Sequence, residues 1–224
     1  MFFQKVAHLV IICLLFFNPF FASLEAFQII KKPVPFSEKR KQLTLDYQKE
    51  HYLIKNPTIY IEPKMIIVHW TALDSFEKSY RSMVQEELHS SRKDLASSQL
   101  GVSSHYLVDR DGTVYLLVDD NIMARHCIGL NHCAVGIENV GGEKGMENLT
   151  KEQMISNCKL ICYLKKKYSK IEYLIGHFEY LDFENTPLFR EKTKSYRTQK
   201  QDPGTKFMFE IRQKLKPLNL KARP

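Results

Sequence analysis

The chain has 224 residues, of which 44% are hydrophobic and 26% are charged. These values are ordinary for a globular domain with a sizeable core, and no internal repeat or low-complexity tract points to a fibrous or disordered chain. The formal net charge of +8 favours anionic partners. Nucleic acid is not expected among them, because the chain has no stripe of arginines and aromatics and no known nucleic-acid-binding motif.

Residues 1–26 are predicted to be a secretory signal peptide. Lys5 precedes an apolar run over residues 6–17, and small residues follow at Ala22, Ser23 and Ala26. The run is shorter than the roughly 20 apolar residues that a membrane span needs. We therefore expect an exported protein that is periplasmic or extracellular, with association with the cell envelope left open. No stable membrane span is expected after the signal peptide is removed. An uncleaved anchor and lipidation at Cys13 are less favoured alternatives.

The rest of the chain is predicted to hold one domain between two polar flanks. Residues 27–57 are basic and polar with three prolines, which is typical of a linker or of an arm lying over the domain surface. The domain is expected to span residues 58–216, and residues 217–224 form a basic tail.

Strands and helices are predicted to alternate along residues 58–216. A strand is expected at 65–68, a helix from a cap at Asp74 or Ser75 to about Leu88, and a hairpin from 105–108 and 113–118. Further along the chain, the patterns predict a strand at 134–140, a helix capped by Thr150 with Gln153 and ending near Lys167, a short strand at 173–175 and a last helix at 207–215. The fold class is therefore α/β, with a mixed central sheet flanked by helices.

Four cysteines follow the predicted signal peptide. Cys127 and Cys133 flank a short segment, so a disulfide between them is possible after export and is left open. Cys158 and Cys162 share one face of a predicted helix, which favours core packing. Structural zinc binding by these four is not expected, because CxxC spacing is absent.

Three metal-capable side chains stand at strand ends or in a turn. His69 and His177 each follow a predicted strand, and Asp202 precedes Pro203 and Gly204 in a turn. Two imidazoles, one carboxylate and a water are a typical ligand set of catalytic zinc. Because these residues lie far apart in the sequence, their spacing alone does not establish the site.

Five segments occur in an order that resembles the type 2 N-acetylmuramoyl-L-alanine amidases, which are related to phage amidase lysozymes and peptidoglycan recognition proteins. The resemblance covers about residues 60–215. The segments are Ile66 to Thr71, Ser104 to Tyr115, Asn131 to Glu138, Ile175 to His177 and Lys200 to Gly204.

The resemblance implies a role for each of seven residues. His69, His177 and Asp202 are implied to bind one Zn²⁺ per chain. Glu138 matches the acidic residue placed beside the metal's water, and Lys200 matches a basic residue that stabilises the oxyanion. His126 and Asn131 fall where the family lines its substrate groove. Some relatives have a tyrosine at the position of Ser104, so a tyrosine-assisted mechanism is not supported here.

The implied activity is hydrolysis of the amide bond between N-acetylmuramic acid and L-alanine in peptidoglycan or muropeptides, in cell-wall turnover or remodelling. The alternative is a recognition module that keeps the groove but does not cut. A helical zinc peptidase is not expected, because His-Glu-x-x-His is absent. A monomer is expected.

The path between the second and third expected ligands is unusually long. His177 and Asp202 are 25 positions apart, whereas many short relatives place them much closer together. We hypothesise that the inserted segment Tyr180 to Arg197 forms one wall of the substrate groove.

Overall fold

The computed structural model describes residues 28–224, so the predicted signal peptide at 1–26 lies outside the described residues. A six-stranded sheet with the order β1-β4-β3-β5-β2-β6 forms its centre. All neighbouring strands are parallel except the antiparallel pair β3–β4, which confirms the predicted hairpin and the mixed sheet. The strands are β1 Ile29–Lys31, β2 Met65–Val68, β3 Tyr106–Val108, β4 Val114–Leu116, β5 Ala134–Asn139 and β6 Tyr173–Gly176.

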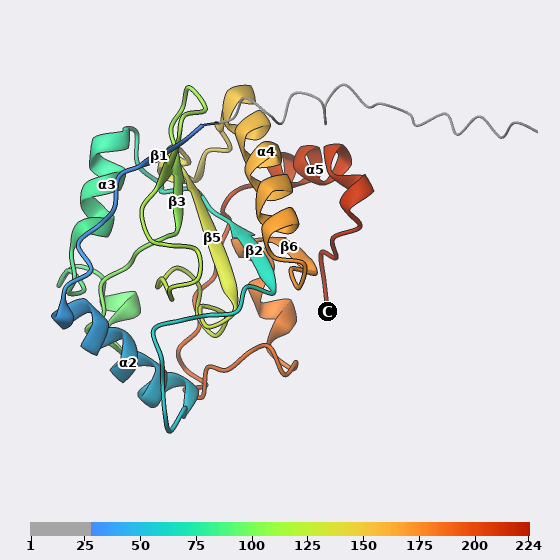
Figure 1. Cartoon of the computed structure of the whole chain (residues 1–224). Coiled ribbons are helices and arrows are strands. Elements are labelled where there is room, and N and C mark those ends of the chain that lie inside the picture. The colour runs from blue at the N-terminus through green and yellow to red at the C-terminus, as the bar shows by residue number, and fades with distance from the viewer. Residues whose placement is uncertain (1–27) are drawn as a thin grey trace, which may run out of the picture.

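Helices cover both faces of the sheet. α4 (Lys151–Lys167) and α5 (Thr205–Lys214) lie together on one face, and α3 (Phe76–Val84) packs on the other (Figure 1). α2 (Glu38–Tyr52) lies on the same side as α3 and packs against Leu100 and Met123. None of the helices within residues 28–224 is long and apolar enough to cross a membrane.

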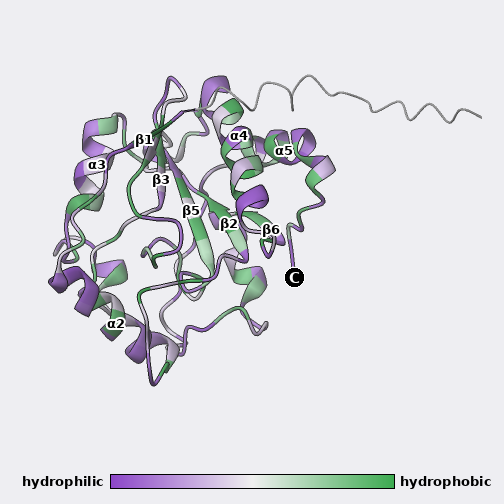
Figure 2. Ribbon diagram, viewed as in Figure 1, coloured by the Kyte–Doolittle hydropathy of each residue, from purple (hydrophilic) through white to green (hydrophobic). Residues whose placement is uncertain are grey.

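The central strands are buried on both faces, which explains their continuous apolar sequence. In β2, Ile66 and Val68 join the cluster under α4 and α5, whereas Met65 and Ile67 belong to a second cluster on the opposite face. All four side chains are inaccessible to solvent, and β2 has the green of hydrophobic residues in Figure 2. Full burial of parallel strands favours such runs over alternation.

α4 follows its sequence pattern closely. Thr150 accepts from the backbone of Gln153, and the Gln153 side chain accepts from the backbone of Thr150, so the predicted capping box is confirmed. Cys158 and Cys162 are buried in the core cluster, as expected. All four described cysteines are free buried thiols, so Cys127 and Cys133 form no disulfide in this structure.

α3 ends earlier than the sequence pattern predicts. The helix stops at Val84 rather than near Leu88, and Gln85 is already extended. The next residues pair with residues 99–101, since Leu88 N donates to Gln99 O and Gly101 N donates to Glu86 O. Tertiary pairing therefore overrides the local helical preference.

The segment 27–57, expected to be a linker or an arm, contains β1 and α2. The helix was missed because its buried side chains are mostly polar, so no hydrophobic period marks it. They are Arg40, Thr44, Tyr47, Gln48, His51 and Tyr52. The basic tail is also held to the domain at the edge of β6. Lys221 N donates to Glu172 O, and Lys221 O accepts from Leu174 N, so the backbone of Lys221 pairs with Tyr173.

Candidate metal and catalytic site

The site lies where β2, β5 and β6 end. Backbone bonds join His69 N to Ile137 O at 2.8 Å and Asn139 N to His69 O at 3.1 Å, which places His69 level with Glu138. Val68 pairs with Gly176, so the next residue in register is His177. The side chains of His69, Glu138 and His177 therefore emerge in one row, on the sheet face opposite α4. Carboxyl ends of parallel strands are a common location of ligand sites.

Asp202 completes a compact triangle of ligand atoms. His69 Nδ1 lies 3.0 Å from His177 Nδ1 and 3.1 Å from Asp202 Oδ2, and His177 Nδ1 lies 2.9 Å from the same oxygen. The 202 backbone is fixed beside the strand, since Phe178 N donates to Asp202 O at 3.0 Å. All three ligand residues are buried. The structure thus brings together residues that are up to 133 positions apart.

These three residues fit a zinc ion. Ligands at about 2.0–2.1 Å in tetrahedral geometry lie about 3.3 Å from one another, close to the observed triangle. Burial, and secondarily His177, lowers the pKa of His69 to about 4, so its ring is neutral near pH 7 and can offer a lone pair. Burial acts to raise the pKa of Asp202, but His177 and His69 outweigh it and keep the carboxylate ionised.

A cavity of about 290 Å³ opens onto the triangle. Every site residue predicted from the sequence lines this one cavity. They are His69, His126, Asn131, Glu138, His177, Lys200 and Asp202.

Glu138 presents a carboxylate to the cavity from β5. Its side chain is partly exposed, but Oε2 is inaccessible and has no hydrogen-bond partner among residues 28–224. Burial, and then the charge of Asp202, raises its pKa, while the charges of Lys200 and Arg92 lower it. An unpaired carboxylate here is costly, which favours a functional role.

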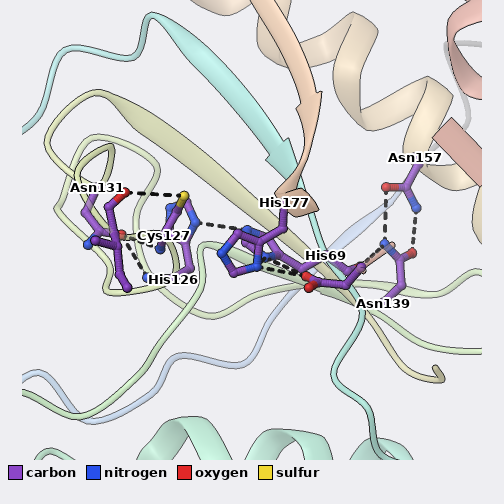
Figure 3. A network of polar contacts seen from close by, with 9 residues as sticks. His69, His126, Cys127, Asn131, Asn139, Asn157 and His177 are labelled. Carbon is purple, nitrogen blue, oxygen red and sulfur yellow. Dashed lines mark hydrogen bonds and ion pairs between the residues drawn. The ribbon is translucent and has the colours of Figure 1, made fainter. Parts of the chain in front are cut away.

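His126 contacts a ligand residue rather than standing apart from the triangle. Its Nδ1 lies 3.1 Å from His69 Nε2, and its Nε2 lies 3.3 Å from Ala134 O (Figure 3). Burial, and then His69, lowers its pKa. The sequence placed His126 in the substrate groove but gave no sign of this contact.

Asn131 is fully buried and organises the backbone beside His126. Its Oδ1 accepts from His126 N at 2.9 Å and from Cys127 N at 2.7 Å. These bonds have a clear structural purpose, and contact of Asn131 or His126 with substrate stays a prediction.

The site is also held from the α4 side of the sheet, which the sequence did not indicate. Asn139 Nδ2 donates to His69 O at 3.0 Å, and Asn157 Nδ2 donates to Asn139 Oδ1 at 2.7 Å (Figure 3). His105 has a structural role: its Nδ1 accepts from Gly136 N and its Nε2 donates to Ile122 O.

The inserted segment reaches the cavity through Tyr196, and its role as a wall of the substrate groove stays a prediction. Arg125 donates to Tyr196 OH at 2.9 Å and lies over the ring of Tyr47, which also lines the cavity from α2. A buried pair, His51 Nδ1 and Glu191 Oε2 at 2.8 Å, fastens the segment to α2.

Comparisons with known proteins agree with this geometry. A family model described as N-acetylmuramoyl-L-alanine amidase matches residues 42–205. The endolysin of Escherichia phage T7 is 38% identical over 73 residues, which cover 31% of this chain and 48% of that protein. The chain therefore spans about half the length of this curated relative.

Solved structures share the fold. The N-acetylmuramoyl-L-alanine amidase LysCS from Clostridium intestinale aligns with a TM-score of 0.54 at 25% identity, covering 87% of this chain and 97% of that one. Bumblebee PGRP-SA aligns with a TM-score of 0.51 at 20% identity, covering 88% and 99%, which concerns the fold alone. Because the family model matches most of the domain, this chain belongs to the N-acetylmuramoyl-L-alanine amidase family.

Proposed function

We propose that the protein is a zinc-dependent amidase that hydrolyses the bond between N-acetylmuramic acid and L-alanine of peptidoglycan stem peptides. The observation that carries the proposal is the triangle of His69, His177 and Asp202, with the unpartnered Glu138 carboxylate in the same cavity. The family and the likeness to LysCS support the choice of bond.

The metal is assigned to the three triangle residues. When bound, zinc lowers the pKa of water and polarises the scissile carbonyl. His69 and His177 hold their rings at the ends of β2 and β6, and Asp202 adds a carboxylate oxygen to the two ring nitrogens.

Glu138 is the proton carrier in this proposal. Glu138 lines the cavity, and no group within residues 28–224 competes for its Oε2, so the carboxylate is available to take a proton from the attacking water. The same group then returns the proton to the leaving nitrogen, which departs as the amine of L-alanine. The lactyl carboxylate stays on the muramic acid.

Lys200 supplies positive charge where negative charge develops. It lines the cavity, and its charge lowers the pKa of Glu138. An ammonium group placed there stabilises the oxyanion of the tetrahedral intermediate.

The predicted signal peptide supports export, so the substrate is peptidoglycan or its soluble muropeptides outside the cytoplasm. The net charge of +8 attracts anionic cell-wall polymers. We propose a role in cell-wall turnover or remodelling.

Mass spectrometry of products from purified sacculi tests this function. Wild type is expected to release intact stem peptides, and a chelator is expected to stop the release. Glu138→Gln should lose activity, whereas Glu152→Gln, the same change on exposed α4 surface, should retain it. Binding without release by the zinc-loaded wild type would identify a recognition module instead.

A further inference from the structure

We propose that His126 is a positioning residue that fixes His69 in the tautomer able to bind metal. The basis is a chain of contacts through both rings. Ala134 O lies 3.3 Å from His126 Nε2, and His126 Nδ1 lies 3.1 Å from His69 Nε2. His69 Nδ1 then faces His177 and Asp202.

The direction of these bonds follows from the first acceptor. A carbonyl oxygen only accepts, so His126 Nε2 carries a hydrogen. The Nδ1 of a neutral His126 ring is then an acceptor, and the hydrogen between the rings belongs to His69 Nε2. His69 Nδ1 is thereby left with a lone pair that points at the other ligand atoms. A metal-binding histidine typically donates its second ring hydrogen to such a partner.

His126 opposes a competing arrangement. Asp202 Oδ2, at 3.1 Å, attracts a hydrogen onto His69 Nδ1, which would remove the lone pair needed by the metal. An acceptor on the Nε2 side favours the other tautomer. Without it, metal binding must first move the hydrogen across the ring.

The ring of His126 sits in a prepared place. Gly136 lies beneath it, and a Cβ at this position would stand 2.7 Å from the ring. Asn131 Oδ1 holds the backbone of residues 126 and 127. The neighbouring Arg125 donates to the carbonyls of Leu95 and Leu100, so the segment has little freedom.

Two variants separate the acceptor from the shape of the ring. His126→Asn keeps an oxygen near the place of Nδ1, whereas His126→Leu keeps comparable bulk without an acceptor. His89→Leu is the matched control, because the exposed His89 ring bonds to Ser91 in its own loop and to no other side chain or backbone group within residues 28–224.

Zinc affinity is measured by competition with a chromophoric chelator, without substrate. His126→Leu is expected to bind zinc about 10- to 100-fold more weakly, with His126→Asn close to wild type and His89→Leu unchanged. Equal zinc affinity of His126→Leu and wild type would overturn the proposal. If His126→Leu then raised only the KM for muropeptides, His126 would contact substrate and would not position His69.

A second measurement remains decisive if the leucine variant does not fold. In the zinc-free wild type, ¹⁵N NMR of the histidine rings should show His69 with its hydrogen on Nε2. A hydrogen on Nδ1 would overturn the proposal. The inference rests on the proposed function only for the presence of the metal. If the tautomer and the zinc affinities are as expected but the protein cuts no muropeptide, the amidase assignment fails and the role of His126 stands.

Discussion

The inserted segment is held to α2 by the buried pair of His51 and Glu191, and Glu191→Ala tests how much that pair matters. The two side chains are 4% and 0% exposed. Glu191 Oε2 lies 2.8 Å from His51 Nδ1, and Oε1 accepts from Thr193 N at 2.8 Å. Alanine leaves the buried His51 ring nitrogen and the partly buried Thr193 backbone nitrogen without this partner.

Each orphaned group costs about 1–3 kcal/mol, and breaking a buried pair by removing one partner typically costs about 3–5 kcal/mol. We expect a loss of about 3–5 kcal/mol in the free energy of unfolding, a large part of the roughly 5–15 kcal/mol of an ordinary domain. Denaturant titration measures the loss. Hydrogen exchange should show faster opening of residues 180–197 than of β2, β5 and β6. Because Tyr196 lines the cavity, KM for muropeptides should rise while zinc content stays unchanged.

Glu184→Ala is the matched control within the same segment. Glu184 pairs with Arg197 at 2.9 Å, but its side chain is 42% exposed, so its loss should cost at most about 1 kcal/mol. If Glu191→Ala destabilises the protein no more than Glu184→Ala, the buried pair does not hold the segment and the reasoning fails.

Three further predictions follow from the site. Glu138→Gln should lower turnover by about 10²- to 10⁴-fold; inductively coupled plasma mass spectrometry should find unchanged zinc content, and near-wild-type turnover would remove Glu138 from the mechanism. Burial lowers the pKa of His105 to about 4. Between pH 6.5, the pKa of an unfolded histidine, and about pH 4, only the unfolded chain takes up the proton. The free energy of unfolding should therefore fall with falling pH by up to about 1.4 kcal/mol per pH unit from this group. In denaturation at several pH values, His105→Asn should show a smaller change in the free energy of unfolding per pH unit than wild type, and an equal change would contradict this. Gly136→Ala should lower the free energy of unfolding by about 1–3 kcal/mol and weaken zinc binding, because its Cβ would stand 2.7 Å from the His126 ring. Calorimetry measures both quantities, and no change in either would show that the His126 ring can move without cost.

The parts of the fold that local patterns encode were predictable. β2 and β5 are apolar runs, the β3–β4 hairpin surrounds an Asp-Gly turn, and Thr150 with Gln153 marks the start of α4. In each case the residues that make up the sequence pattern are the same few neighbouring residues that form the structural element. α2 differs because its buried residues, such as Arg40 and Gln48, are polar and bond to distant backbone carbonyls.

The site was predictable as a set of residues but not as a network. Ordered motifs pointed to seven side chains, and all seven are among those that line the cavity. The contact between His69 and His126 spans 57 positions, and that between His51 and Glu191 spans 140. No sequence period reports such contacts, since they depend on how the strands and loops come together.

The outer edge of the sheet at β1 also bears on how copies of this protein meet. An unpaired strand edge invites strand addition from another chain and, with it, aggregation. Here the edge strand has three residues, Lys31 is exposed, and Pro33 follows without a backbone hydrogen to donate. A second copy would meet a short, charged and interrupted edge, so self-association through the sheet is disfavoured. The monomer expected from the sequence stays a prediction, which sedimentation at high protein concentration tests.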